Sequence, residues 1–384
     1  MATKTGVWDL QDVRDKQLQD LWSYEEPAQW WSWGYNGSKG KLGHNDKITR
    51  SSPTQIGTAT NWVSLSGERH VGGAVNADGE LFLVGKGDSN GQLAQGNNTN
   101  YSSPVQVPGT TWDGRNFRMG CESQISMLKT DGTLWSWGYA CYGRAGTPNT
   151  GCVNISSPRQ IPGTTWASNF THSRGGGAIK TDGTLWMWGI NAEGNLGQNS
   201  RTYRSSPIQI PGTTWKQGCG NGSGIAAVKT DGTLWKWGRG TDGTGLNNTV
   251  NYSSPAQIPG TTWKDVGNGN HHFMATKTDG TLWSFGQNSG GQLGQNDVQP
   301  GDGGYSSPVQ IPGTTWNYVS SGMGNHSLVT KTDGTLWTWG NNSQGQLGQN
   351  NRTQYSSPVQ IGSGTNWQYA MSLSYASQAI GYQA

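Results

Sequence analysis

Long apolar runs, cysteines and a surplus of charge are all scarce in this sequence, and each scarcity excludes a class of protein. No stretch of about 18 apolar residues occurs, so we expect no membrane-spanning helix and no membrane insertion. The N-terminal residues lack the apolar core of a secretory signal, so no signal peptide is expected. Lys and Arg number 26 against 23 Asp and Glu, and this balance does not predict the basic surface of a nucleic-acid-binding protein.

Cysteine chemistry is limited to four residues: Cys121, Cys141, Cys152 and Cys219. They are too few for a disulfide scaffold, and none has the CxxC spacing of a zinc site. Cys141 and Cys152 bracket the irregular loop YGRAGTPNTG. The two could pair, or they could be separate thiols, because spacing alone does not fix the geometry of a disulfide.

Signatures of catalysis are also missing. No G-x-S-x-G or H-E-x-x-H pattern occurs, and GSKGKL at 37–42 lacks the spacer and the Ser or Thr of a phosphate-binding loop. Histidines follow one position of the repeat described below: His70, His271, His272 and His326. The other copies have no histidine there: Gln124, Gly175, Gly224 and Gln378. We therefore expect no catalytic residue, no cofactor and no metal site, and we expect the histidines to satisfy backbone groups instead.

What the sequence has is glycine, tryptophan and one recurring motif. Gly numbers 61 and Trp 21, while hydrophobic residues make up only 31% of the chain. The clearest copy of the motif is KTDGTLWTWGNNSQGQLGQN at 331–350, followed by SSPVQI at 356–361. Its Asp-Gly pair predicts a hairpin with a two-residue loop. The alternation after the turn places Trp337 and Trp339 on one face of a strand.

Counting the copies predicts the architecture. A Ser-Ser-Pro marker recurs at intervals of 48 to 54 residues: Pro53, Pro104, Pro158, Pro207, Pro255, Pro308 and Pro358. That interval suits a propeller blade of four short strands. Asp-Gly turns occur six times, and the chain begins just after a turn position and ends just before one. We therefore predict an all-β, seven-bladed β-propeller over residues 28–384, closed by pairing of the N- and C-terminal strands.

Each unit also carries a tryptophan in a TTW or TNW context: Trp62, Trp112, Trp166, Trp215, Trp263, Trp316 and Trp367. Blades pack on both faces, so these large rings can supply the core that scarce Leu and Ile do not. We expect them to be structural. A role in stacking on carbohydrate stays open for any tryptophan that is exposed.

The motif resembles a known repeat. The pattern G-x-N-x-x-G-Q-L-G, present as GNNSQGQLG at 340–348 and GQNSGGQLG at 286–294, is similar to the repeat of the regulator of chromosome condensation family. So is SSGMGNHSLVTKTDGTLW at 320–337. This resemblance implies a seven-bladed propeller whose Gly-His strand runs near the central channel. A bacterial β-lactamase inhibitory protein shares the repeat, which favours a protein-binding module. The basic tail and inserted wedge linked to nucleotide exchange are not evident.

If the repeat is structural, function should lie where copies depart from it in loops. The main departures are 141–155 and the insertion DVQPGDGG at 297–304, and GRGTDGTGLNN at 238–248 is a milder one. The binding residues we predict on these loops are Tyr142, Arg144, Asp242, Asp297 and Asp302. The alternative is neutral drift of loop sequences.

Residues 1–27 precede the repeat and form a predicted docking segment. Apolar side chains recur there at roughly helical intervals, which predicts a short N-terminal helix. The docking residues are Trp8, Leu10, Val13, Leu18, Leu21 and Trp22. They could pack on the chain's own propeller or on another subunit.

The stretch TKTGVWDLQDVRDKQ at 3–17 resembles the leader of marine bacteriophage structural proteins. This resemblance implies a virion-associated propeller, in a tail, fibre or capsid, whose protein partner is another virion protein or a host-surface receptor. The alternative is a cellular or secreted protein-binding propeller that acts as an inhibitor or as a nucleotide-exchange-type regulator.

Overall fold

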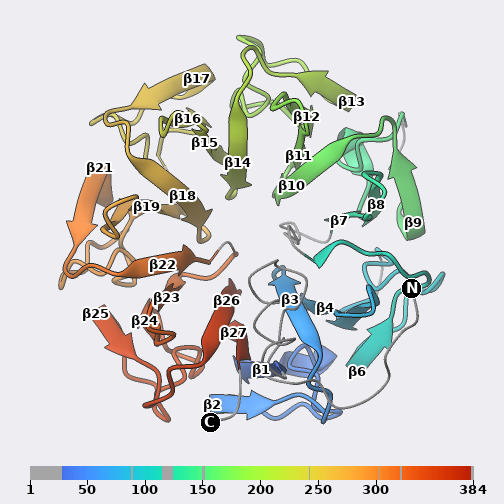
Figure 1. Cartoon of the computed structure of the whole chain (residues 1–384), viewed down its shortest axis with the longest axis vertical. Helices are drawn as coiled ribbons and strands as arrows, with labels where there is room; N and C mark the ends of the chain where they lie inside the picture. Colours follow the sequence, from blue (N-terminus) through green and yellow to red (C-terminus); the bar gives the residue numbers. More distant parts are fainter. Residues whose placement is uncertain are drawn as a thin grey trace, which may run out of the picture.

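The described part of the chain forms seven small antiparallel sheets arranged in a ring around a central axis (Figure 1). The computed structural model describes residues 28–87, 90–114, 124–148, 152–241, 243–301, 303–320 and 322–381. The sequence prediction of a seven-bladed all-β propeller is confirmed. The predicted N-terminal helix lies outside the described residues. No helix in the described ranges is long and apolar enough to cross a membrane.

We number the blades in chain order and give the strands of each from the axis outward. Blade 1 holds β26 (Trp367–Leu373), β27 (Ala376–Gly381), β1 (Gln29–Gly34) and β2 (Arg50–Gln55). Blade 2 holds β3 (Trp62–Gly67), β4 (Val71–Asn76), β5 (Leu81–Gly85) and β6 (Tyr101–Gln106). The described part of blade 3 holds β7 (Gln124–Leu128), β8 (Leu134–Gly138) and β9 (Ile155–Ile161).

The remaining four blades repeat the same order. Blade 4 holds β10 (Trp166–His172), β11 (Gly175–Lys180), β12 (Leu185–Gly189) and β13 (Arg204–Gln209). Blade 5 holds β14 (Trp215–Gly220), β15 (Gly224–Lys229), β16 (Leu234–Gly238) and β17 (Tyr252–Ile258). Blade 6 holds β18 (Trp263–Asn268), β19 (His272–Lys277), β20 (Leu282–Gln287) and β21 (Gly304–Ile311). Blade 7 holds β22 (Trp316–Val319), β23 (His326–Lys331), β24 (Leu336–Gly340) and β25 (Tyr355–Gln360).

The two ends of the described chain meet in blade 1. Strand β1 pairs on one side with β2 and on the other with β27, where Trp31 lies opposite Ala379 and Ser32 opposite Gln378. This pairing removes the open sheet edges that an unclosed array would expose. The predicted closure by the terminal strands is therefore confirmed.

The hairpin turns differ from the prediction in one respect. The Lys331 amide donates to the Thr335 carbonyl at 3.0 Å, and the Lys331 carbonyl accepts from the Gly334 amide at 3.0 Å, so the loop between Lys331 and Thr335 has three residues, not two. Gly334 has a φ of 78°, which suits the left-handed last position of a three-residue hairpin loop. The Asp333 carboxylate accepts hydrogen bonds from the Thr335 amide at 3.0 Å and hydroxyl at 2.7 Å, and these bonds lower the pKa of Asp333. The Asp-Gly motif was recognised correctly, but its loop length was predicted one residue short.

The repeated lysine before each turn packs between two tryptophans. In blade 7 the Lys331 ammonium lies 4.5 Å from the Trp316 ring centre and 4.4 Å from that of Trp337. The two rings contact each other edge to face at 6.0 Å. The same arrangement recurs around Lys129, Lys180, Lys229 and Lys277. In blades 3 to 7, cation–π contacts therefore add to the aromatic burial that stabilises the blade, in line with the structural role expected of these tryptophans.

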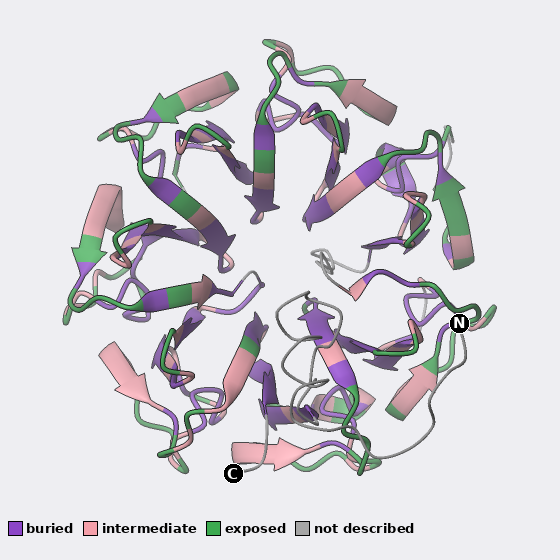
Figure 2. Cartoon of the chain, viewed as in Figure 1, coloured by how far each residue is buried: buried purple, intermediate pink, exposed green. Residues whose placement is uncertain are grey.

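The strand nearest the axis is the one that begins at the TTW or TNW tryptophan. Innermost strands of neighbouring blades contact one another, whereas the fourth strand of each blade lies outermost and is only half-buried or exposed (Figure 2). His326 and His272 are the first residues of β23 and β19. These are second strands, one strand farther from the axis than the innermost strand next to the channel. Strand pairing also places Val71 and Ala376, not His70 and Gln378, at the equivalent position of blades 2 and 1.

Candidate partner-binding face

The common strand order places all the long loops on one side of the ring. In each blade the connection from the third to the fourth strand emerges at the face opposite the Asp-Gly turns. We call this side the loop face, and the other the turn face. Its loops are residues 35–49, 86–100, 139–154, 190–203, 239–251, 288–303 and 341–354. All five predicted binding residues fall in these loops.

The first half of each loop joins neighbouring blades. In blade 7 the carbonyl of Gln346 accepts hydrogen bonds from the Trp33 indole at 2.8 Å and from the Ser377 hydroxyl at 2.8 Å, both in blade 1. The Asn350 amide donates to the Ser51 carbonyl at 2.8 Å. Indoles of other blades make the same contact to the preceding blade: Trp137, Trp188, Trp237 and Trp339. The recurring Gln-Leu-Gly and Ser-Ser-Pro motifs are thus explained by blade-to-blade contacts, which leaves the second half of each loop free to vary.

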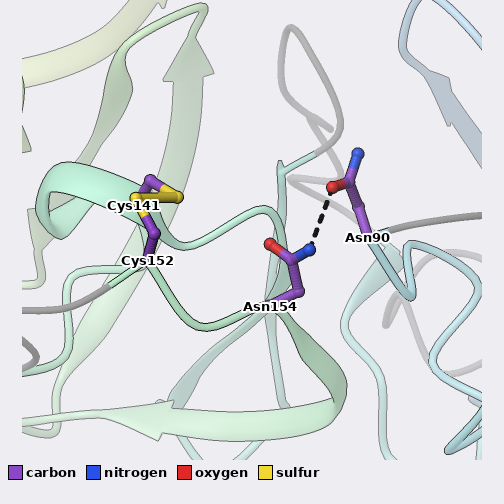
Figure 3. The surroundings of a disulfide bond; sticks show 4 residues. All are labelled: Asn90, Cys141, Cys152 and Asn154. Carbon is purple, nitrogen blue, oxygen red and sulfur yellow. Dashed lines mark hydrogen bonds between the residues drawn. A yellow bond between two sulfur atoms is a disulfide. The ribbon is translucent and has the colours of Figure 1, made fainter.

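The loop of blade 3 is braced by a disulfide between Cys141 and Cys152 (Figure 3). Within it, the short helical turn η3 (Cys141–Gly143) holds Tyr142 in a left-handed conformation, with φ of 58°, and 58% of that side chain is exposed. Beyond the disulfide, the Asn154 amide donates to Asn90 of the blade 2 loop at 3.2 Å (Figure 3). Of the two alternatives left open by spacing, the structure shows the paired one.

Arg144 occupies the position that is Gln in Gln-Leu-Gly copies. Its backbone carbonyl accepts a hydrogen bond from the Trp188 indole at 3.0 Å, as the Gln carbonyl does elsewhere. Its guanidinium lies 4.9 Å from the ring centre of Tyr139. The backbone of Arg144 is therefore part of the junction between blades 3 and 4, while its side chain lies against the ring of Tyr139.

Asp297 is engaged inside its own loop. Its carboxylate accepts hydrogen bonds from Asn288 at 2.6 Å, Gln299 at 3.2 Å and the Tyr305 hydroxyl at 2.8 Å. The bond to Asp297 also raises the pKa of Tyr305. This geometry gives Asp297 an evident role in shaping the loop. A contact from Asp297 to a partner stays a prediction.

Several predicted residues lie outside the described residues. These are the predicted binding residues Asp242 and Asp302, and the docking residues Trp8, Leu10, Val13, Leu18, Leu21 and Trp22. Among the residues that are described, no three His, Cys, Asp or Glu side chains gather in a way that could hold a metal ion.

Sequence reasoning missed a basic pocket between blades 1 and 2 on the loop face. Basic side chains from three segments line it: Lys39, Lys41, Arg69, His70 and Lys86. The signal was present in one place, because GKLG at 40–43 has Lys41 where other copies have the Gln of GQLG. The remaining basic residues are far apart in sequence, so no local motif contains them.

Comparisons with known proteins agree with the fold. Two profiles of the regulator of chromosome condensation (RCC1) repeat match residues 333–371 and 318–346. The ultraviolet-B receptor UVR8 of Arabidopsis thaliana is 29% identical over 183 residues, which cover 45% of this chain and 40% of UVR8. Human protein RCC2 is 34% identical over 127 residues, which cover 32% of this chain and 23% of RCC2. These matches span less than half the length of either relative.

Among solved structures, Prp20p from Saccharomyces cerevisiae, a protein with binding properties toward Gsp1p and histones, superposes with a TM-score of 0.80. The two chains are 16% identical, and the superposition covers 94% of this chain and 92% of Prp20p. Identity this low supports the shared fold only. Together with the seven sheets and the matched repeats, it shows that the chain is a seven-bladed β-propeller carrying regulator of chromosome condensation repeats.

Proposed function

We propose that this propeller is a non-enzymatic module that binds a partner protein through its loop face and acts as a regulator or inhibitor of that partner. The observation that carries the proposal is that each loop contains both residues that contact the neighbouring blade and residues that do not. The residues of the recurring motifs make contacts between blades, and side chains outside those motifs, such as Tyr142, reach solvent. A fold by itself does not specify a function, so the proposal depends on the exposed loop positions where the sequence departs from the repeat.

The loop of blade 3 has the chemistry of an interface centre. Tyr and Arg are enriched at the residues that dominate binding energy in protein interfaces. Tyr142 is exposed, and the guanidinium of Arg144 in the same loop lies 4.9 Å from the ring centre of Tyr139. The disulfide between Cys141 and Cys152 restrains the loop before any partner arrives, which reduces the entropy lost on binding.

The relatives support a protein partner without identifying it. Prp20p has binding properties toward Gsp1p and histones. For this chain we propose only that the partner is a protein. Nucleotide exchange and inhibition are the two forms of regulation to be tested.

Photo-crosslinking from the loop face tests the proposal. A photoreactive phenylalanine analogue replaces Tyr142 in the full chain, and a second version carries it at Tyr369, which is also exposed but lies on an innermost strand near the turn face. In extract of the source cells, we expect a discrete protein crosslinked from position 142 and not from 369. Unlabelled wild-type chain should compete for this adduct, and unlabelled Tyr142→Ala should compete about tenfold less well.

Crosslinking from position 369 alone, or equal competition by Tyr142→Ala, would contradict binding through the loop face. Once the adduct is identified, release of labelled GDP from a captured GTPase, or loss of activity of a captured enzyme, distinguishes exchange from inhibition.

A virion location remains a separate proposal, and the likeness that suggests it lies in residues 3–17, outside the described residues. Its support is the likeness to phage leaders and the repetitive composition. Purified particles that lack this protein while the host cell contains it would rule the virion location out.

A further inference from the structure

The basic pocket on the loop face is built from segments at opposite ends of the chain. The loop after β1 supplies Tyr35, Lys39 and Lys41, and the turn between β3 and β4 supplies Arg69 and His70. The start of the β5–β6 loop adds Lys86, and the turn between β26 and β27 adds Ser374 and Tyr375. The hollow has a volume of about 290 Å³. It therefore lies at the junction of blades 1 and 2, where the closing blade meets its neighbour.

Charge of one sign gathers in this hollow. Five of its lining residues are basic, and no carboxylate is among the described residues that line it. Positive groups collected in a concave site raise the local concentration of anions, because the low-dielectric walls focus their field. Arg and Lys also donate charge-assisted hydrogen bonds to oxyanions, which are stronger than neutral ones.

Lys41 fixes the base of the pocket. Only 5% of this residue is exposed, and its ammonium donates to the carbonyls of Arg69, at 3.3 Å, and Ser374. Burial lowers the pKa of Lys41 to about 7, while the nearby Glu68 acts in the opposite direction. The ammonium thus ties together the turns of blades 1 and 2 that carry the other lining residues. A negative group in the pocket would favour its charged form.

This pocket is particular to one junction. The position of Lys41 is held in other blades by uncharged side chains: Gln92, Asn195, Thr244, Gln292 and Gln346. In blade 3 it is Arg144, whose side chain is placed against Tyr139. The position of Lys86 is uncharged in five other blades and is basic only in blade 5, as Arg239; the uncharged residues are Tyr35, Tyr139, Ile190, Gln287 and Asn341. The concentration of basic groups therefore departs from the repeat at this site.

Two exposed tyrosines complete the walls. Tyr35 is 43% exposed and Tyr375 is 46% exposed, and both line the hollow. A Cβ on Gly37 would lie 2.9 Å from the Tyr35 ring, so glycine at this position lets the ring lie close against the backbone. An aromatic ring with a polar tip suits the faces and hydroxyl groups of a sugar-sized ligand.

We propose that this pocket binds the phosphate or sulfate group of a small ligand of about monosaccharide size, with Arg69 and Lys86 contacting the oxyanion and the two tyrosines flanking the rest of the ligand. The volume is close to the lower end of the range for small-molecule sites, so a larger ligand would extend into solvent. The site is distinct from the Tyr142 loop on blade 3, so the two proposals can fail separately.

Calorimetric titration of the full chain with glucose 6-phosphate at low salt tests this proposal. We expect saturable binding that weakens as salt is added, because exposed charges are screened. The double substitution Arg69→Gln/Lys86→Gln should weaken binding at least about tenfold, given the usual strength of hydrogen bonds to charged groups. Lys216→Gln changes an exposed lysine on β14, away from the pocket, and should leave the affinity within about twofold of wild type.

Glucose 6-sulfate and inorganic phosphate separate the sources of the oxyanion. Tighter binding of either hexose derivative than of inorganic phosphate supports a sugar-sized ligand, and the tighter of the two identifies the anion. The proposal is overturned if wild type shows no saturable binding, if neutral glucose binds as well, or if the double variant, with an unchanged melting temperature, binds with wild-type affinity.

Discussion

Acidification from about pH 7 to about pH 4.5 is expected to destabilise the propeller by several kcal/mol, because three histidines are buried where they cannot be protonated at little cost. They are His172, His272 and His326, all with no exposed surface. His272 Nε2 lies 2.9 Å from the Ser327 hydroxyl, and His326 Nε2 lies 2.8 Å from the Ser377 hydroxyl. Each of these bonds joins one blade to the next.

The pKa of each of the three histidines is lowered from 6.5 to about 3, and burial is the leading cause. The unfolded chain therefore binds more protons than the folded chain between these two values. The stability is fully present above pH 6.5 and is lost as the pH falls toward about 3. At about pH 4.5, each histidine costs roughly 2 to 3 kcal/mol of folding free energy.

The turn aspartates do not account for this window. Hydrogen bonds from the following threonine lower the pKa of Asp333 and its equivalents below their usual 3.8, so their contribution is lost only in stronger acid. Between about pH 6.5 and 4.5 the histidines should dominate the slope of stability against pH.

Urea unfolding at a series of pH values checks this expectation. Replacing both His272 and His326 by Gln, the residue present at this position in blade 3, should remove about two thirds of the pH dependence that the three buried histidines create between about pH 6.5 and 4.5, because His172 is retained. His271→Gln, at the half-exposed neighbouring position, removes only the smaller charge effect of His271 on the pKa of His272 and should change the slope much less than the double substitution. A stability that is equally insensitive to pH in wild type and in the double variant would contradict the assignment.

Removing the side chain of Trp33 is expected to lower stability by about 3 to 5 kcal/mol, the usual cost of replacing a buried aromatic residue by Ala. Trp33 has no exposed surface and donates its indole hydrogen bond to the Gln346 carbonyl of blade 7 at 2.8 Å. Trp33→Ala would leave a cavity at the junction where the last blade meets the closing blade, and the Gln346 carbonyl would keep only the hydrogen bond from the Ser377 hydroxyl.

Trp33→Phe is the matched variant, since it keeps a ring and removes the donor. Blade 6 already has Phe285 at this position, so the substitution should cost only about 1 kcal/mol. Urea midpoints with unchanged denaturant slopes would measure both values. A loss below about 1 kcal/mol for Trp33→Ala would mean that blades 7 and 1 are not packed together as described.

Much of this fold could be predicted from the spacing of motifs alone, because every blade is built from the same repeat and packs against neighbouring blades of the same kind. The Asp-Gly turns, the paired tryptophans and the complementary chain ends are all short-range patterns with a fixed period. The extra loop residue at Thr332 was not predicted, since Asp-Gly pairs occur in both two- and three-residue hairpin loops. The position of Lys331 between Trp316 and Trp337 depends on the packing of three strands, which no local pattern reveals.

The candidate sites were harder to predict for the same reason. Tyr142 was identified because its loop departs from the repeat. Asp297 is predicted on the same grounds, yet two side chains of its own loop, Asn288 and Gln299, and Tyr305 of the following strand already donate hydrogen bonds to it. The basic pocket draws on Lys41, Arg69 and Tyr375, which come together only when the ring closes. A site that closure creates cannot be found from any single stretch of sequence.

Closure by the terminal strands is the claim on which the blade order, the junction at Trp33 and the basic pocket all depend. Two variants test it, one with cysteines at positions 31 and 379 and one with cysteines at 32 and 378, in place of Trp31/Ala379 and Ser32/Gln378. Facing residues along an antiparallel strand pair alternate between two Cα separations, so at least one of the two cysteine pairs should have a distance that suits a disulfide. A pair at Leu328/Thr338, within the β23–β24 hairpin, is the positive control. We predict that mild oxidation of the folded protein crosslinks one of the two terminal pairs, identified by peptide mapping, as completely as the control. Crosslinking of the control with neither terminal pair would show that the ring is not closed in this way.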